Sequence, residues 1–186
     1  GGSALGAGSL AASAFLVTNT SAAAAALGWV ATEWLLQGRP TVLGAISGSV
    51  AGLVAITPAS GFVGPVSAVI IGLLAGILCY LAVSVVKARL GYDDALDAFG
   101  IHGVGGIWGA LATGLFASRA VNPAGTDGLF FGNPGQLLTQ AEAVVATVVF
   151  AAAATLVIIK AVDLTTRIRA TVEEEIMGLD LPMHGE

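Results

Sequence analysis

Charged residues are scarce in this sequence. Asp, Glu, Lys and Arg make up 10% of its 186 residues, whereas 56% are hydrophobic and the mean hydropathy is +0.90. A soluble domain carries about 25% charged residues. The shortage excludes an ordinary soluble domain and indicates that lipid surrounds most of the chain.

Basic residues and cysteine are scarcer still. The sequence has seven Lys and Arg but twelve Asp and Glu, so its net charge is −5 and its pI is near 4.8. No basic patch is available, and we predict no nucleic-acid partner. The single cysteine, Cys79, lies in an apolar run, which excludes an internal disulfide and favours a small buried residue. We expect no metal, no other cofactor and no enzyme.

An initial methionine and a basic N-terminal segment are also absent. A secretory signal peptide begins with such a basic segment, ahead of its apolar core. We therefore expect no signal peptide in this chain, and we expect the natural N-terminus to lie upstream.

Five apolar segments dominate what the sequence does contain. A helix needs about 20 residues to cross the hydrocarbon core of a membrane. We expect helices near residues 4–36, 42–58, 65–86, 97–117 and 136–162, within a transmembrane bundle over residues 1–163. Residues 164–186 are polar and are predicted to form a tail. The predicted fold class is all-α, a polytopic membrane helix bundle.

Basic residues predict how the bundle is oriented. Lys and Arg accumulate on the cytoplasmic side of a membrane. Six of the seven follow the first, third or fifth segment, namely Arg39, Lys87, Arg89, Lys160, Arg167 and Arg169. We therefore expect a multi-pass protein of the cell membrane whose C-terminus is cytoplasmic.

Small residues recur at intervals of four in several segments. This spacing stacks them on one helix face and is typical of closely packed membrane helices. The runs are Gly44, Gly48 and Gly52, then Gly72 and Gly76, then Gly105 and Gly109. They predict close packing and carry no functional information.

His102 is the polar residue that stands out, because it lies inside the fourth apolar segment. A membrane interior disfavours the imidazolium cation and favours neutral imidazole, which can both donate and accept a hydrogen bond. A histidine that only joins two helices is the structural alternative. Intramembrane ionisable residues are more often functional, so we favour a functional site at mid-bilayer depth.

Other polar residues have mainly structural interpretations. Asp93, Asp94 and Asp97 precede the His102 helix and are suited to capping it, with a cation-exit role for Asp97 as the alternative. The pair Thr57-Pro58 predicts either an outer vestibule or a helix stop, because proline leaves the carbonyl of Val54 without its usual donor.

Further polar side chains are expected to be structural. Thr18, Asn19 and Thr20 are predicted to bond between helices, and the triplet Asn122-Pro123-Ala124 is predicted to be an ordinary turn.

Three stretches together carry a family resemblance. They are DDALDAFGIHGVGGIWG at 93–109, GLVAITPASG at 52–61, and LGW at 27–29 followed by GRPT at 38–41. The chain resembles the C-terminal half of an Amt-type ammonium transporter of the Amt/Mep/Rh family. The match extends over essentially the whole chain.

The resemblance implies an eleven-helix trimer in which two inverted five-helix repeats surround one pore per subunit. Inverted repeats around a central site are a common transporter plan. This chain would hold helices seven to eleven, which are the second repeat without its first helix and the final long helix. The other pore histidine and the phenylalanine gates would belong to the half that precedes it.

The resemblance also assigns residues to steps of transport. His102 matches a pore histidine, Ser3 matches the serine of an outer ammonium-recruitment site, and Thr57 falls near the outer vestibule. An ammonium ion would be recruited outside and deprotonated, and ammonia and a proton would pass through the histidine-lined pore. The tail would contact neighbouring subunits and PII-type regulatory proteins.

Two alternatives remain open at this point. One is an electroneutral channel for ammonia or another gas, which would give flux without current. The other is an ammonium sensor that signals through its tail, for which a long signalling domain would be the expected sign. In either case the partners are ammonium or ammonia, the lipid bilayer and other copies of the chain.

Overall fold

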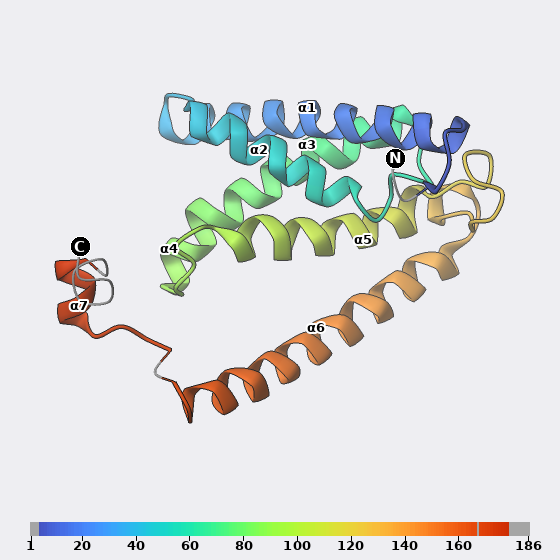
Figure 1. The fold of residues 1–186 in the computed structure, drawn as a ribbon. Helices are drawn as coiled ribbons and strands as arrows, with labels where there is room; N and C mark the ends of the chain where they lie inside the picture. Colours follow the sequence, from blue (N-terminus) through green and yellow to red (C-terminus); the bar gives the residue numbers. More distant parts are fainter. Residues whose placement is uncertain (1–3, 167, 179–186) are drawn as a thin grey trace. The chain divides into compact units, whose positions relative to one another are not determined.

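The regular structure of this chain is helical. The computed structural model describes residues 4–166 and 168–178, and within these residues there is no strand. The α-helices are α1 (Ser9–Gln37), α2 (Val42–Ile56), α3 (Pro65–Leu81), α4 (Lys87–Leu90), α5 (Val104–Phe116), α6 (Pro134–Asp163) and α7 (Val172–Met177), as drawn in Figure 1. Two π-helical turns, η2 (Ala82–Val86) and η3 (Phe99–Gly103), and a 3-10 turn, η4 (Leu129–Phe131), complete the regular elements.

Four helices are long and apolar enough to cross a membrane, within the part of the chain described. They are Ser9–Gln37, Pro65–Leu90, Phe99–Phe116 and Pro134–Asp163. The fifth expected span, α2, has 15 residues and a length of about 22 Å, which is less than the roughly 30 Å of the hydrocarbon core.

The first helix begins later than expected, at Ser9 instead of residue 4. Gly6 and Gly8 precede it, and Leu5 adopts a positive φ of 55° that a right-handed helix does not allow. Internal contacts divide the chain into two units, Gly1–Val144 and Val145–Glu186, so the division falls within α6.

Helix α1 is the centre of the first unit, because α2 and α3 both pack against it (Figure 1). Helix α5 then packs against α2 and α3. The glycine spacing explains how closely these backbones approach. A Cβ added at Gly52 would lie 2.5 Å from the carbonyl oxygen of Ser21, and one added at Gly48 would lie 2.6 Å from Cβ of Trp29. Only glycine fits at such contacts.

Polar side chains in α1 bond differently from the expectation. Thr18, Asn19 and Thr20 were expected to bond between helices, but each donates to a carbonyl of its own helix four residues earlier. Ser21 makes the interhelical bond instead, because its hydroxyl lies on the fully buried face and donates to the carbonyl of Gly52 at 2.9 Å.

A buried carboxylate fixes the start of α2. Glu33 of α1 is only 6% exposed, and it accepts bonds from the backbone N–H of Thr41 (3.0 Å) and from its hydroxyl (2.9 Å). Thr41 is the N-cap of α2, and its hydroxyl oxygen accepts the N–H of Gly44. The carboxylate therefore supports the cap and complements the positive end of the helix dipole.

Replacing Glu33 by Ala is expected to lower the free energy of unfolding by about 1–3 kcal/mol, because the N–H and the hydroxyl of Thr41 lose a charged acceptor. Thermal unfolding of the purified complete protein measures the change. Glu142→Ala removes an exposed carboxylate on α6 and serves as the control. Equal melting temperatures for the two variants would show that Glu33 does not support α2.

Candidate functional site

His102 lies in the π-helical turn η3, immediately before α5. The N–H of Val104 bonds to the carbonyl of Phe99, five residues earlier, which is the π-helical pattern. Its neighbours Gly100 and Ile101 are buried, whereas His102 is exposed and has no hydrogen-bond partner among the residues described. The imidazole therefore lies on a face that the described packing leaves uncovered.

The depth of His102 follows from a contact with the most apolar of the four long helices. The thiol of Cys79 lies 3.7 Å from the carbonyl oxygen of Ile101. Cys79 belongs to the continuous helix Pro65–Leu90, about 21 Å along the axis from its start and about 17 Å from its end. The turn η3, which carries His102, is thus level with the middle of the helix Pro65–Leu90, although η3 lies at the start of the helix that continues as α5.

The two π-helical turns pack directly on each other. A Cβ added at Gly100 in η3 would lie 2.6 Å from Cγ2 of Val83 in η2. The N–H of Lys87 closes η2 by bonding to the carbonyl of Ala82, five residues earlier. Such turns occur frequently at functional sites. The sequence analysis missed both, because a single i→i+5 turn leaves no recognisable residue pattern.

The acidic residues before α5 have distinct roles. Asp94 accepts the N–H of Phe99 at 3.1 Å and the N–H of Gly100 at 3.2 Å, so its carboxylate caps the start of η3. Asp97 instead pairs its Oδ1 with Nζ of Lys87 at 2.7 Å, and the same Nζ donates to the carbonyl of Asp94 at 2.6 Å. Sequence reasoning used Lys87 only for orientation, although its position directly after an apolar helix was a sign of a specific partner.

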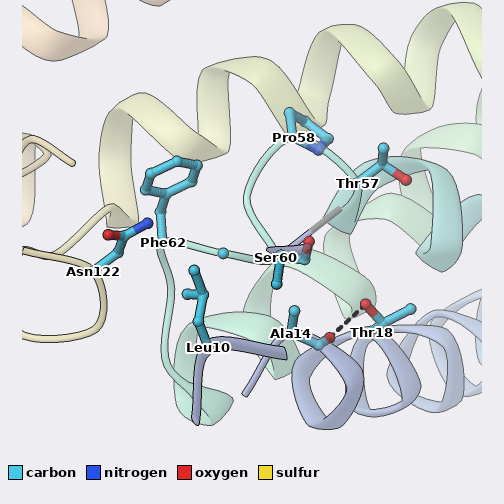
Figure 2. A pocket seen from close by; sticks show the side chains of 10 residues that line it. Leu10, Ala14, Thr18, Thr57, Pro58, Ser60, Phe62 and Asn122 are labelled. Atoms are coloured by element: carbon cyan, nitrogen blue, oxygen red, sulfur yellow. Dashed lines mark hydrogen bonds between the residues drawn. The ribbon is translucent and has the colours of Figure 1, made fainter. Parts of the chain in front are cut away.

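A pocket of about 490 Å³ lies at the other end of α5. Figure 2 shows it between the start of α1, the turn after α2 and the loop that follows α5. Its lining residues are Ala4, Leu10, Ala14, Thr18, Thr57, Pro58, Ser60, Gly61, Phe62 and Asn122. The orientation predicted from the basic residues puts this end of the helices on the outer side.

Two threonines give the pocket hydrogen-bond acceptors. The hydroxyl of Thr18 donates to the carbonyl of Ala14 at 2.7 Å (Figure 2), and that of Thr57 donates to the carbonyl of Leu53 at 2.7 Å. Since each hydroxyl hydrogen is taken by its own helix, each oxygen is left as an acceptor. A ligand with several N–H donors and no acceptor suits such a lining.

The expected free carbonyl at the end of α2 is absent. Pro58 cannot donate, but the N–H of Thr57 takes the carbonyl of Val54 at 3.2 Å. The hydrogen bond at the end of α2 therefore spans three residues instead of four, and it satisfies the carbonyl of Val54, which proline would leave without a donor. The acceptors at this site are therefore side-chain oxygens.

The predicted site residues fall into three levels along the bundle. Thr57 lines the pocket, and Ser3 lies outside the described residues. His102 does not line the pocket, since the start and end of α5 are separated by about 20 Å. Asp94 and Asp97 lie before η3, on the side of His102 away from the pocket. Across the described ranges there is no group of three or more His, Cys, Asp or Glu that could hold a metal ion.

Sequence reasoning missed three pocket residues. Thr18 and Asn122 had been assigned structural roles, and Ser60 had been noted only within the stretch at 52–61 that carries the family resemblance. They come from segments more than 30 residues apart, so only the folded arrangement brings them together. The one local sign was that hydroxyl residues cluster at the same end of two apolar helices.

Comparisons with known proteins agree along the whole chain. A family model described as Ammonium Transporter Family matches residues 1–186. The ammonium transporter of Bacillus subtilis (strain 168) is 55% identical over 185 residues, which cover 100% of this chain and 46% of that protein.

Two solved structures are similar in three dimensions. Saccharomyces cerevisiae Mep2 has 36% sequence identity and a TM-score of 0.86, over 92% of this chain and 40% of that one. A protein described as Sensor Amt Protein has 31% identity and a TM-score of 0.87, over 98% of this chain and 44% of that one. The chain spans less than half the length of these relatives.

Proposed function

Because the chain belongs to the ammonium transporter family, we propose that the complete protein moves ammonium across a membrane. Membership and the solved relatives confirm the sequence resemblance and the all-α membrane helix bundle, which is a partial ammonium-transporter fold. They point to a multi-pass membrane transporter and away from an enzyme. The observation that carries the proposal is His102, whose imidazole is level with the middle of an apolar helix and has no hydrogen-bond partner among the described residues.

Recruitment begins in the outer pocket. An ammonium ion carries four N–H donors and no acceptor, and the hydroxyl oxygens of Thr18 and Thr57 are acceptors with their own hydrogens already committed. Phe62 lines the same pocket, and an aromatic face attracts a cation. Ser3 is proposed to contribute a further hydroxyl.

Conduction then depends on His102. After ammonium loses a proton, neutral ammonia enters the apolar interior, where an ion without partners would be strongly disfavoured. Neutral imidazole can accept one hydrogen bond and donate another, so it can hold ammonia and relay a proton. Sodium and potassium ions have no proton to lose and are refused. The second pore histidine is proposed to come from the part of the protein outside this chain.

Assembly and location follow from the same membership. We propose a homotrimer in the cell membrane with its C-terminus in the cytoplasm, as the basic residues indicate. The acidic tail is proposed to contact a PII-type regulatory protein. Part of that tail, residues 179–186, lies outside the described residues.

Replacing Thr57 by Val is expected to raise the apparent KM for ammonium about tenfold, because a hydrogen bond to a charged ligand contributes about 1.5–3 kcal/mol. The maximal rate should change little, since His102 is far from the pocket. Uptake of ammonium against concentration measures both constants. Thr139→Val on α6, which removes a hydroxyl with the same intrahelical bond, is the control. Equal KM values would exclude Thr57 from recruitment.

Electrical recording on the complete protein in lipid vesicles tests the proposed transport. Saturable inward current with ammonium, and none with potassium, is the expected result. Ammonia flux without current would replace the proposal by an electroneutral channel. If a folded preparation shows no ammonia flux and no current, the proposed transport is contradicted.

Ammonium sensing is the second candidate, favoured by the likeness to Sensor Amt Protein. A sensor would bind ammonium in the outer pocket and change the contacts of its tail without rapid turnover. Binding of ammonium to the folded protein without uptake would support this candidate.

A further inference from the structure

We infer that Lys87, with Asp97 and Asp94, is a positioning device that holds the two π-helical turns together and thereby sets the depth and direction of His102. The inference rests on the proposed pore role of His102. It assigns a task to residues that neither recruit nor conduct ammonium. Its basis is the contacts between η2 and η3.

Lys87, the first residue of α4, makes contacts at the end of η2 and just before the start of η3. Its backbone N–H closes η2 through the carbonyl of Ala82, while its Nζ reaches Asp97, the residue two places before η3. The side chains of this ion pair are 28% and 33% exposed, so water screens them only in part. One residue therefore couples the end of one long apolar helix to the beginning of the next.

Four hydrogen bonds restrain the start of η3. Asp94 accepts the N–H groups of Phe99 and Gly100, which are the first two donors of the turn. Lys87 holds the carbonyl of Asp94 and the carboxylate of Asp97. Each contact restricts the turn that begins at Phe99 and ends at Gly103, and His102 lies within it.

The backbone of Asp97 shows that this position is constrained. Its φ is +56°, a region that costs roughly 1 kcal/mol or more for a residue with a side chain. The surrounding bonds have to maintain such a conformation. The ion pair with Lys87 is the bond that acts on the side chain of Asp97 itself.

A π-helical turn makes the position of His102 sensitive to these contacts. It contains one residue more than the α-helical turn it replaces, and the two forms differ by about 100° in the direction of the residues that precede the insertion. If the contacts of Lys87 with Asp94 and Asp97 are lost, the turn can relax toward an α-helical turn. Packing of Val83 next to Gly100 and against the buried cluster that contains Ile101 opposes this relaxation.

The geometric test uses a cysteine in place of His102 as a reporter, in the complete protein with Cys79 replaced by Ser and other cysteines removed. Lys87→Met keeps the aliphatic stem but removes the ion pair, and Asp97→Asn keeps a residue that tolerates positive φ. Each should change the rate of modification by a small methanethiosulfonate at least fivefold. Arg89→Met, which removes an exposed cation two residues from Lys87, should leave it within twofold.

Transport of ammonium by the protein with His102 in place supplies the second readout. Lys87→Met and Asp97→Asn should each lower the maximal rate per folded molecule about tenfold and leave KM unchanged, because the pocket is at the other end of α5. Their combination should be no worse than either alone. Lys87→Arg, which restores the ion pair, should recover the rate. A loss of folded protein alone would not produce this split.

The outcomes separate the inference from the proposed function. If His102→Ala abolishes transport while Lys87→Met and Asp97→Asn behave like Arg89→Met in both assays, the positioning role is wrong and the pore role stands. If His102→Ala transports normally, the pore role is wrong, and the cysteine reporter still decides whether Lys87 sets the geometry of the turn.

Discussion

Replacing His102 by Ala in the complete protein is expected to reduce selective ammonium transport by roughly 100-fold or more, the size of effect that a positioned proton-transferring side chain contributes. The substitution removes the imidazole of His102. The nearby residues Gly103 and Gly106 have no polar side chain that could replace it. Ammonia then loses its partner, and the proton loses its path. Uptake and current in lipid vesicles measure both losses.

The stability of this variant distinguishes a pore residue from a packing residue. His102 is exposed and makes no hydrogen bond within the described part of the chain, so its loss should change the free energy of unfolding by less than about 0.5 kcal/mol. A histidine that only joined two helices would show the opposite result, with lowered stability and normal transport per folded molecule. Unchanged selective current would contradict the role proposed for His102.

Properties that depend on composition and spacing could be predicted from the sequence. The scarcity of charge identified a membrane protein, and the apolar runs at 65–86 and 136–162 overlap α3 and α6, whereas the run at 97–117 begins seven residues before α5. The glycine spacing predicted close packing, and the structure places the backbone of α1 against Gly48, Gly52, Gly72 and Gly76. His102 was found because one ionisable residue in an apolar helix is conspicuous in a linear sequence.

Properties that depend on tertiary arrangement could not be predicted. The pocket gathers Thr18 from α1, Thr57 after α2 and Asn122 from the loop after α5, and no local pattern joins them. The two π-helical turns pack on each other at Val83 and Gly100, which are 17 residues apart in the sequence. The partner of Lys87 was also not predicted, because Asp97 already had an adequate explanation as a helix cap.

The structure shows that the proposed site residues lie at different levels along the bundle. The sequence pointed to Ser3, Thr57 and His102, and in the structure Thr57 and His102 lie at opposite ends of α5, so the proposed steps of recruitment, conduction and positioning fall at different levels of the bundle. The pocket with Thr57 lies at one end of α5, His102 lies at the other, and the Lys87–Asp97 pair lies beyond it. A substitution in one level should therefore affect KM or maximal rate separately, which is why the two constants have to be measured together.

Replacing Gly72 by Val is expected to abolish folding, because α1 and α3 touch at the level of their backbones. A Cβ at Gly72 would overlap the carbonyl oxygen of Ser21, and Ser21 is itself fixed by its bond to the carbonyl of Gly52. A backbone atom cannot rotate away as a side chain can, so the helices have to separate.

Separation of α1 from α3 would also uncover the contact between Gly76 and Ala25, one turn farther along. Overpacking of a well-packed core costs about 1–3 kcal/mol and more where backbone must move, and a native protein has only about 5–15 kcal/mol of stability. The yield of monodisperse complete protein in detergent should fall more than tenfold. Gly64→Val, at a position where an added Cβ meets nothing within 4 Å, is the matched control. Equal yields for the two variants would mean that α1 and α3 do not pack through these glycines in the complete protein.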